Sequence, residues 1–207
     1  MFDSGASGPI EWAVAGQPLP GEDESGDGWV VADTSGATLL GVIDGLGHGP
    51  LAAVAAHHAA AVLGENPAEP LDALFVLCHQ ALGGTRGAAI TVAAIDHVHA
   101  TLAWLGVGNV AGSLVRTSPG GPMVQSSVMQ RGGVIGHQLP GALRPVRTPI
   151  QPGDVLLLGT DGLATGFDDR PDLGQSAAAL AQGILAHCAK GTDDALVLAA
   201  RYRGRHR

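Results

Sequence analysis

GVIDGLGHG, residues 41–49, joins a predicted strand to a predicted helix through an acid and three glycines. The apolar run 37–43 is typical of a buried strand, and this strand ends at Asp44. Glycine allows a sharp turn and a close approach of the backbone, and Pro50 suits the first position of the Ala-rich helix that follows. Metal and phosphate sites are commonly built in this way, although an ordinary strand-to-helix turn has the same pattern.

The composition indicates one globular domain with an acidic surface. Of the 207 residues, 45% are hydrophobic and 14% are charged, which is enough apolar material for a sizeable core. The formal net charge is -8, and four of the 11 Lys and Arg residues stand in the tail 201–207. Such an acidic surface argues against nucleic acid as a substrate. We expect the tail to be a frayed, solvated end, with binding of an acidic partner as the alternative.

The sequence also lacks the marks of a membrane or secreted protein. No apolar run reaches the roughly 18 to 20 residues that span a bilayer, and the first ten residues lack the basic start of a signal peptide. We therefore expect a cytoplasmic protein. Cys78 and Cys188 lie in apolar, helix-like stretches and form no metal-type pair, so buried free thiols are expected rather than a disulfide.

Hydrophobic periodicity predicts strands on both sides of a helical pair. Strands are expected over 9–15, 27–31, 37–43, 88–95, 98–107, 110–115, 154–159 and 195–200, and helices over 51–63, 71–82 and 173–189. Residues 117–149 contain many turn formers and receive no assignment. His57, His58 and His79 lie on the predicted helices, where packing or solvent exposure is expected rather than ligand binding.

Acidic residues stand at the ends of four predicted strands. Asp44 and Asp161 follow strand exits, whereas Asp27 and the pair Asp193 and Asp194 precede strand entrances. In antiparallel sheets the exit of one strand and the entrance of its neighbour lie at the same edge, so these carboxylates are expected to converge. Like charges within about 4 Å repel by around 4 kcal/mol at an effective dielectric constant near 20. A cation is therefore the natural partner of the group.

Oxygen ligands without Cys or suitably spaced His select hard ions, Mg²⁺ or Mn²⁺. Two such ions roughly 3.5 to 4 Å apart would share one carboxylate and hold a hydroxide for attack on phosphorus. The alternative is that these acids are turn and cap residues scattered over the surface.

Several motifs then occur in a fixed order along the chain: SGD at 25–27, VIDGLGHG at 42–49, GVGNV at 106–110, PGDVLLLGTDG at 152–162 and DDALVL at 193–198. In order and spacing they resemble the metal-dependent protein phosphatases (PPM, type 2C-like), specifically the SpoIIE/RsbX branch. CHQALGGTRGAA at 78–89 is further similar to the RsbX-type stand-alone phosphatases. The resemblance implies an α+β fold, a four-layer α-β-β-α sandwich of two antiparallel sheets flanked by helices. One such domain would occupy residues 1–207, with a core over about 9–200 and the basic tail after it.

The resemblance also implies a centre of two Mn²⁺ or Mg²⁺ ions at one edge of the sandwich. Asp44 resembles the bridging ligand, and Gly45 resembles the residue that contributes a backbone carbonyl. Asp161 and Asp193 resemble the remaining ligands of one ion, and Asp27 resembles a ligand or a neighbouring acid of the other.

Other positions carry further expectations. Asp154 and Asp194 are assigned supporting roles. The wider family has a histidine two residues after the bridging Asp, where this chain has Leu46, so His48 is the candidate general acid, with water as the alternative. Nothing basic precedes Arg86, which is the candidate for orienting the substrate phosphate, with a structural salt bridge as the alternative.

Together these features predict a protein serine/threonine phosphatase in which a metal-bound hydroxide attacks the phosphoryl group. The resemblance implies a phosphorylated STAS-domain protein of a stress-signalling complex, or stressosome, as the substrate. We expect a monomer that contacts neither nucleic acid nor membrane. The alternative is a catalytically weak or inactive pseudophosphatase that keeps the fold as a protein-binding module.

Overall fold

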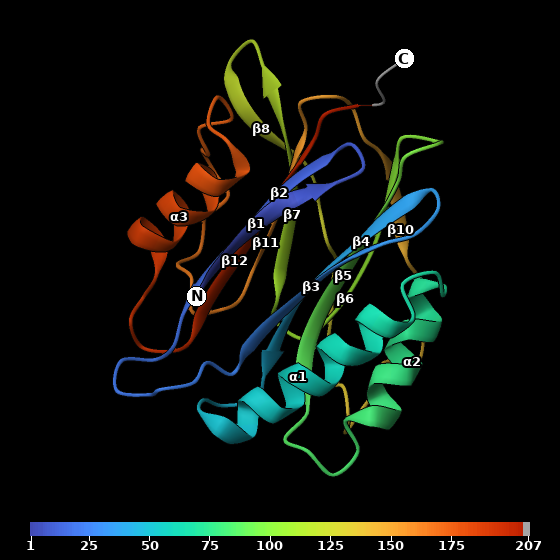
Figure 1. Cartoon of the computed structure of the whole chain (residues 1–207), viewed down its shortest axis with the longest axis vertical. Helices are drawn as coiled ribbons and strands as arrows, with labels where there is room; N and C mark the ends of the chain where they lie inside the picture. The colour runs from blue at the N-terminus through green and yellow to red at the C-terminus, as the bar shows by residue number, and fades with distance from the viewer. Residues whose placement is uncertain (205–207) are drawn as a thin grey trace.

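Two antiparallel β-sheets form the centre of the computed structural model, which describes residues 1–204 (Figure 1). One sheet, here sheet A, contains β1 (Phe2–Ser7), β2 (Ile10–Gln17), β7 (Ala111–Ser118), β8 (Gly121–Ser127), β11 (Val155–Gly159) and β12 (Ala195–Tyr202). The other, sheet B, contains β3 (Asp27–Asp33), β4 (Ala37–Gly45), β5 (Ala88–Asp96), β6 (Thr101–Val107), β9 (Gln130–Arg131) and β10 (Val146–Pro149). The strand orders are β1-β2-β12-β11-β7-β8 and β10-β6-β5-β4-β3, and the short β9 lies parallel to β6.

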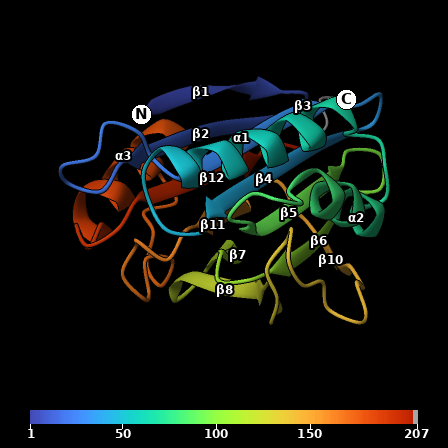
Figure 2. The same ribbon diagram turned by 90° about the horizontal axis from the view of Figure 1, so that it is seen from below.

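Helices cover the outer faces of both sheets and complete four layers (Figure 2). Helices α1 (Pro50–Glu65) and α2 (Leu71–Ala81) lie on sheet B, and α3 (Ala177–Cys188) lies on sheet A. The predicted α-β-β-α sandwich is therefore confirmed. No helix among residues 1–204 is both long enough and apolar enough to cross a bilayer.

The continuous apolar runs in the sequence have a direct structural cause. In β4, Leu40 and Val42 point into the core between the sheets, whereas Leu39 and Ile43 pack against the helices. Leu156 and Leu157 of β11 divide in the same way between the inter-sheet core and the layer under α3. Because central strands are buried on both faces, every position is apolar until the strand reaches the edge of the sandwich.

The structure departs from the predicted boundaries where strands are exposed. The edge strand β1 was not predicted, because five of its six residues are exposed and give no apolar alternation. The unassigned segment 117–149 contains β8, β9 and β10, which are half exposed or very short.

The first residues of the basic tail 201–207 also differ from the prediction. Arg201 belongs to β12, is only 6% exposed, and donates a hydrogen bond to the backbone oxygen of Gln175. Arg203 forms an ion pair with Glu11. The expectation of a frayed, solvated end is therefore wrong for these residues, and residues 205–207 lie outside the described part of the chain.

Both cysteines are free thiols, as predicted. Cys78 is buried, and this burial raises the pKa of its thiol to about 12. Cys188 is only partly buried.

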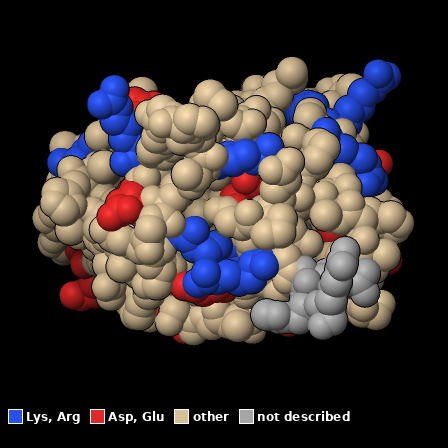
Figure 3. Space-filling model, turned by 90° about the horizontal axis from the view of Figure 1, so that it is seen from above, with Lys and Arg blue, Asp and Glu red and all other residues tan. Residues whose placement is uncertain are grey.

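The two ends of the sandwich differ in charge. The exits of β4 and β11 and the entrances of β3 and β12 lie at one end, which we call the carboxylate edge. Figure 3 looks onto the opposite end, where Arg side chains gather. Arg116, Arg201 and Arg203 belong to that end, because they stand at the far ends of β7 and β12.

Candidate functional site

Asp27 and Asp44 lie directly opposite each other on neighbouring antiparallel strands. Asp27 opens β3 and Asp44 stands near the end of β4, so both carboxylates reach the carboxylate edge from sheet B. Opposite residues in an antiparallel pair have Cα atoms about 4.5 to 5.5 Å apart, so two acids here repel each other.

Sheet A brings three further acids to the same place. Asp161 follows β11, and Asp193 and Asp194 precede β12, its neighbour in the sheet. Burial, followed by repulsion from Asp161, Asp193 and Asp194, raises the pKa of Asp44 to about 7. Burial and the charge of Asp44 raise the pKa of Asp27 well above its usual range. We call Asp27, Asp44, Asp161, Asp193 and Asp194 the carboxylate cluster.

Two glycines allow the acid-bearing segments to come so close. A Cβ atom on Gly45 would lie 2.2 Å from the backbone oxygen of Ala52 in α1. A Cβ atom on Gly162 would lie 1.9 Å from the backbone oxygen of Asp194. Neither contact is possible for a side chain, so the glycine after each strand-end acid is required by packing between chain segments.

The two adjacent acids of the cluster have different tasks. Both carboxylate oxygens of Asp194 accept backbone hydrogen bonds of 2.8 Å, from Leu19 and Gly26, which attach the loop before β3 to the centre. Asp194 is also buried, at 3% exposure. Asp193 is less buried, and one of its oxygens accepts a hydrogen bond of 2.9 Å from the Asp194 backbone N–H. Asp194 therefore holds the local fold, and Asp193 has more capacity left for a ligand.

Asn109 contacts acids from both sheets. It lies in the three-residue link that carries the chain from β6 in sheet B to β7 in sheet A. Its Nδ2 donates to Asp161 Oδ2 at 2.7 Å, and its side chain also hydrogen-bonds Asp44 and opposes the rise in the pKa of that acid. Sequence reasoning noted the GVGNV motif but gave Asn109 no role.

Thr160 and Lys190 also contact the cluster, and both were missed as site residues. The Thr160 hydroxyl donates to Asp27 Oδ2 at 2.8 Å. Lys190 donates through Nζ to the backbone oxygen of Asp161 at 2.6 Å. The sequence places both residues close to predicted metal ligands. Thr160 stands directly before Asp161, and Lys190, the chain's one lysine, stands three residues before Asp193.

His48 lies on the loop between β4 and α1, and Arg86 reaches this loop from the connection between α2 and β5. His48 Nδ1 is 2.7 Å from Glu22 Oε1, and the His48 side chain is 53% exposed. Arg86 Nη1 is 3.5 Å from the backbone oxygen of His48. Among the described residues Arg86 has no carboxylate partner, so the predicted alternative of a structural salt bridge has no counterpart here. In the described part of the chain, no hydrogen bond or ion pair joins the His48 side chain to the carboxylate cluster.

Asp154 lies away from the other predicted site residues. It precedes β11, whereas Asp161 follows this strand, so the length of β11 separates the two acids. Arg116 donates two hydrogen bonds of 2.7 Å to the Asp154 carboxylate, whose side chain is 1% exposed. Any support from Asp154 must therefore act through the fold of sheet A and not through contact with the cluster.

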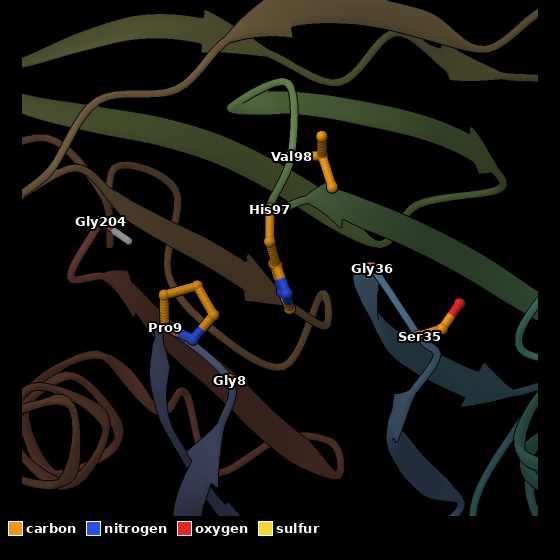
Figure 4. Close-up of a pocket in the computed structure, with 7 residues that line it drawn as sticks. All are labelled: Gly8, Pro9, Ser35, Gly36, His97, Val98 and Gly204. Atoms are coloured by element: carbon orange, nitrogen blue, oxygen red, sulfur yellow. The ribbon is translucent and has the colours of Figure 1, made fainter. Parts of the chain in front are cut away.

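A separate hollow of about 340 Å³ lies at the opposite end of the sandwich, between the β1–β2, β3–β4 and β5–β6 turns (Figure 4). His97 points into this hollow, and its Nε2 is 2.9 Å from the Thr38 hydroxyl. Thr38 is in turn hydrogen-bonded to Ser7 and Asp33. This partly buried network joins β1 to sheet B, and it includes no member of the carboxylate cluster.

The donor set of the carboxylate cluster fits hard divalent cations. It contains only carboxylate oxygens, and no ion pair among residues 1–204 neutralises any of its members. The raised pKa of Asp44 shows negative charge that a cation would compensate. In the described chain, however, no three Asp, Glu, His or Cys side chains are already arranged around one ion position. Full coordination would therefore need adjustment of side chains, backbone oxygens or water.

The family model described as Stage II sporulation protein E (SpoIIE) matches residues 34–203. The chain belongs to the SpoIIE family. A search of curated proteins returned no match. The family predicted from the sequence motifs is therefore confirmed.

Solved structures extend this SpoIIE-family assignment to the whole fold. A chain from "The bacterial stressosome: a modular system that has been adapted to control secondary messenger signaling" is 29% identical, with a TM-score of 0.83, over 93% of this chain and 99% of that one. RsbX in complex with magnesium is 21% identical, with a TM-score of 0.82, over 97% and 99%. The catalytic domain of the serine/threonine protein phosphatase PstP in complex with two manganese ions is 19% identical, with a TM-score of 0.65, over 93% and 97%. This SpoIIE-family chain thus has the PP2C-type phosphatase fold and is homologous to enzymes.

Proposed function

We propose that this protein is a metal-dependent phosphatase that hydrolyses phosphoserine or phosphothreonine on a signalling protein. The observation that carries the proposal is the carboxylate cluster, in which two acids from sheet B and three from sheet A meet without a compensating ion pair. Membership of the SpoIIE family supports it, as do the magnesium and manganese complexes of structurally similar phosphatases.

Within this proposal, two Mn²⁺ or Mg²⁺ ions would be held by Asp27, Asp44, the backbone oxygen of Gly45, Asp161 and Asp193. When bound, such ions activate water as a nucleophile and neutralise charge on the phosphoryl oxygens. The protein orients its ligands through Thr160, which hydrogen-bonds Asp27, and through Asn109, which hydrogen-bonds both Asp44 and Asp161.

The loop after β4 carries the candidate proton donor for the leaving oxygen, and the candidate for the phosphate lies beside this loop. We propose His48 as the proton donor to the leaving oxygen of the substrate, with Glu22 fixing its Nδ1 side and water as the alternative donor. Arg86, whose guanidinium lies beside the same loop and forms no ion pair with a described carboxylate, is proposed to orient the phosphoprotein.

The proposed substrate is a phosphorylated STAS-domain regulator of a stress-signalling complex. The structural similarity to RsbX and to a chain of the bacterial stressosome supports this choice. A monomer acting in the cytoplasm, without nucleic acid or membrane as partner, completes the proposal and agrees with the acidic composition.

The test is release of inorganic phosphate from a phosphoserine STAS protein with Mn²⁺, with Mg²⁺ and with excess chelator. We expect turnover only with added Mn²⁺ or Mg²⁺. Asp161→Asn should abolish this turnover, and the exposed control Glu65→Gln at the end of α1 should retain it. Turnover that survives exhaustive chelation, or that Zn²⁺ alone restores, would contradict the proposed chemistry.

A binding module without catalysis is the second candidate, favoured by one observation. No three potential side-chain ligands in residues 1–204 already surround a common ion position. This candidate predicts saturable binding of the phosphoprotein with no phosphate release at any concentration of Mn²⁺ or Mg²⁺. The same assay, combined with a binding measurement, separates the two functions.

A further inference from the structure

A hollow of about 290 Å³ lies beside the carboxylate cluster, on the sheet A side. Asp161 and Asn109 form the part of its wall that touches the cluster, and Thr165 and Lys190 form other parts. A group bound in this hollow would therefore lie next to Asp161. Arg86 does not line this hollow and lies instead beside Gly47 and His48.

The backbone around Lys190 is fixed against the turn that carries Asp161. Lys190 N–H donates to the backbone oxygen of Gly162 at 2.9 Å, and Ala164 N–H donates to the backbone oxygen of Cys188 at 2.7 Å. Leu163 and Ala189 pair as an antiparallel bridge between these two hydrogen bonds. The lysine is thus attached to the Asp161 turn by its own backbone, which limits where its ammonium group can go.

The ammonium group keeps hydrogen-bonding capacity for a ligand. Lys190 Nζ has three N–H donors, and one of them binds the Asp161 backbone oxygen at 2.6 Å. Within residues 1–204, Lys190 forms no ion pair with a carboxylate, whereas Arg116 and Arg203 are both paired with acids. Its charge is therefore available beside a site that is proposed to receive a phosphate.

We propose that Lys190 is a substrate-binding residue whose ammonium group binds an anionic oxygen of the phosphoprotein in this hollow. The oxygen belongs either to the phosphate itself or to a carboxylate close to it in the substrate. This inference rests on the proposed function for its substrate class. It adds to Arg86 a second basic contact, which reaches the centre from the sheet A side.

The test is equilibrium binding, so that it does not depend on turnover. A fluorescent peptide of the substrate phosphorylation site, with a non-hydrolysable phosphonate in place of phosphoserine, is titrated with Mn²⁺-loaded protein. We expect Lys190→Gln to weaken binding about tenfold, because a charge-assisted hydrogen bond is lost, and Lys190→Arg to stay within about threefold of the wild type. The loss should shrink at high salt, because the contact is exposed.

Arg147→Gln is the matched control, because it removes the same unit charge from exposed Arg147 on β10, in the other sheet. It should leave the dissociation constant unchanged. Equal weakening by Arg147→Gln and Lys190→Gln would show a general effect of net charge and would overturn the assignment. The assignment would also be overturned if Lys190→Gln left the dissociation constant unchanged, or if the wild type showed no measurable binding of the peptide.

Two further measurements show whether Lys190 binds the phosphate or a carboxylate of the substrate. They also distinguish failure of the Lys190 assignment from failure of the proposed catalytic function. If Lys190 binds the phosphate, Lys190→Gln should also weaken competition by inorganic phosphate. If it binds a neighbouring carboxylate, only peptides that retain their acidic residues should respond to the substitution. Loss of peptide binding in Lys190→Gln, with no phosphate release by the wild type, would reject the proposed catalysis and keep Lys190 as a binding residue.

Discussion

Thr160 donates a hydrogen bond of 2.8 Å to Asp27, across the two sheets of the sandwich. Thr160 follows β11 in sheet A, and Asp27 begins β3 in sheet B. In this bond the Asp27 carboxylate accepts a hydrogen from the Thr160 hydroxyl. The bond opposes the rise in the pKa of Asp27 that burial and the charge of Asp44 cause. Loss of the hydroxyl should therefore affect both the charge and the orientation of one proposed metal ligand.

Thr160→Val should weaken Mn²⁺ binding by roughly tenfold, because loss of a hydrogen bond worth about 1 to 3 kcal/mol raises the pKa of Asp27 further and a proton then competes with the metal. Thr160→Ser keeps the hydroxyl and should restore most of the affinity. Isothermal titration calorimetry of the chelator-treated proteins measures both. Equal affinities in Thr160→Val and the wild type would show that this hydrogen bond does not prepare the metal site.

Asp44→Asn should preserve the thermal stability of the metal-free protein but abolish the rise in Tm that metal causes in the wild type. It removes one charge from the carboxylate cluster, so the metal-free variant should melt at the same temperature as the wild type or higher. Wild type at a free metal concentration of 100 times Kd should gain about 2.7 kcal/mol per site, or roughly 5 to 11 °C in Tm. Asp44→Asn should lose this shift together with catalysis.

Thermal melts of Asp44→Asn, wild type and the exposed control Glu65→Gln, with and without Mn²⁺, give the comparison. A wild-type Tm that saturating metal does not change would remove the metal-site assignment.

The metal-free protein should lose stability as pH rises. An Asp in the unfolded chain titrates near 3.9, whereas the pKa of folded Asp44 is about 7. The folded state therefore holds this proton more tightly, and the resulting stability is complete below about pH 4 and is lost as pH rises through 7. Urea unfolding in chelator between pH 4 and pH 8 measures the trend. The slope should be shallower in Asp44→Asn, and identical slopes would contradict the pKa of Asp44.

Arg116→Ala should destabilise the fold without changing metal affinity. The substitution leaves the Asp154 carboxylate, whose side chain is 1% exposed, without its ion-pair partner. Breaking a largely buried pair in this way costs about 3 kcal/mol. Urea unfolding should show this loss, and Mn²⁺ titration of the folded variant should not differ from wild type. A weaker metal affinity would instead show that Asp154 influences the centre through β11.

Arg86→Ala should raise KM for the phosphoprotein while sparing turnover of a small aryl phosphate. The guanidinium lies beside the loop that carries His48 and contacts only a backbone oxygen there, so its removal leaves no described carboxylate unpaired. Steady-state kinetics with both substrates gives the comparison. Equal losses on both substrates, together with a lower Tm, would assign Arg86 to the structure of the loop.

The sequence predicts the strands whose two faces are both buried. β4, β11 and β12 are apolar at successive positions, because one face meets the other sheet and the other meets a helix. The edge strand β1 is largely exposed, and β8 alternates only weakly, so neither has a clear pattern. The acids at strand ends were identifiable because they interrupt the apolar runs.

The remaining contacts of the site depend on which segments meet across the two sheets. Thr160 and Asp27 are 133 residues apart in sequence, and Asn109 and Asp161 are 52 apart. Local propensity and periodicity carry no information about such pairs. Asp154 shows the opposite case, because a motif places it near Asp161 in sequence while β11 separates them in space.

The position of β12 in sheet A has a consequence for how the protein is made. β12 follows every other described strand in the sequence, yet it lies between β2 and β11 in the sheet. Asp193 and Asp194 stand at its entrance, so a nascent chain on the ribosome has only part of the carboxylate cluster until this strand emerges and inserts. Domains generally fold as units, so this sandwich is complete only after its last described strand has left the ribosome. Metal capture should therefore be a late event in the biogenesis of this protein, completed only when β12 closes the sheet.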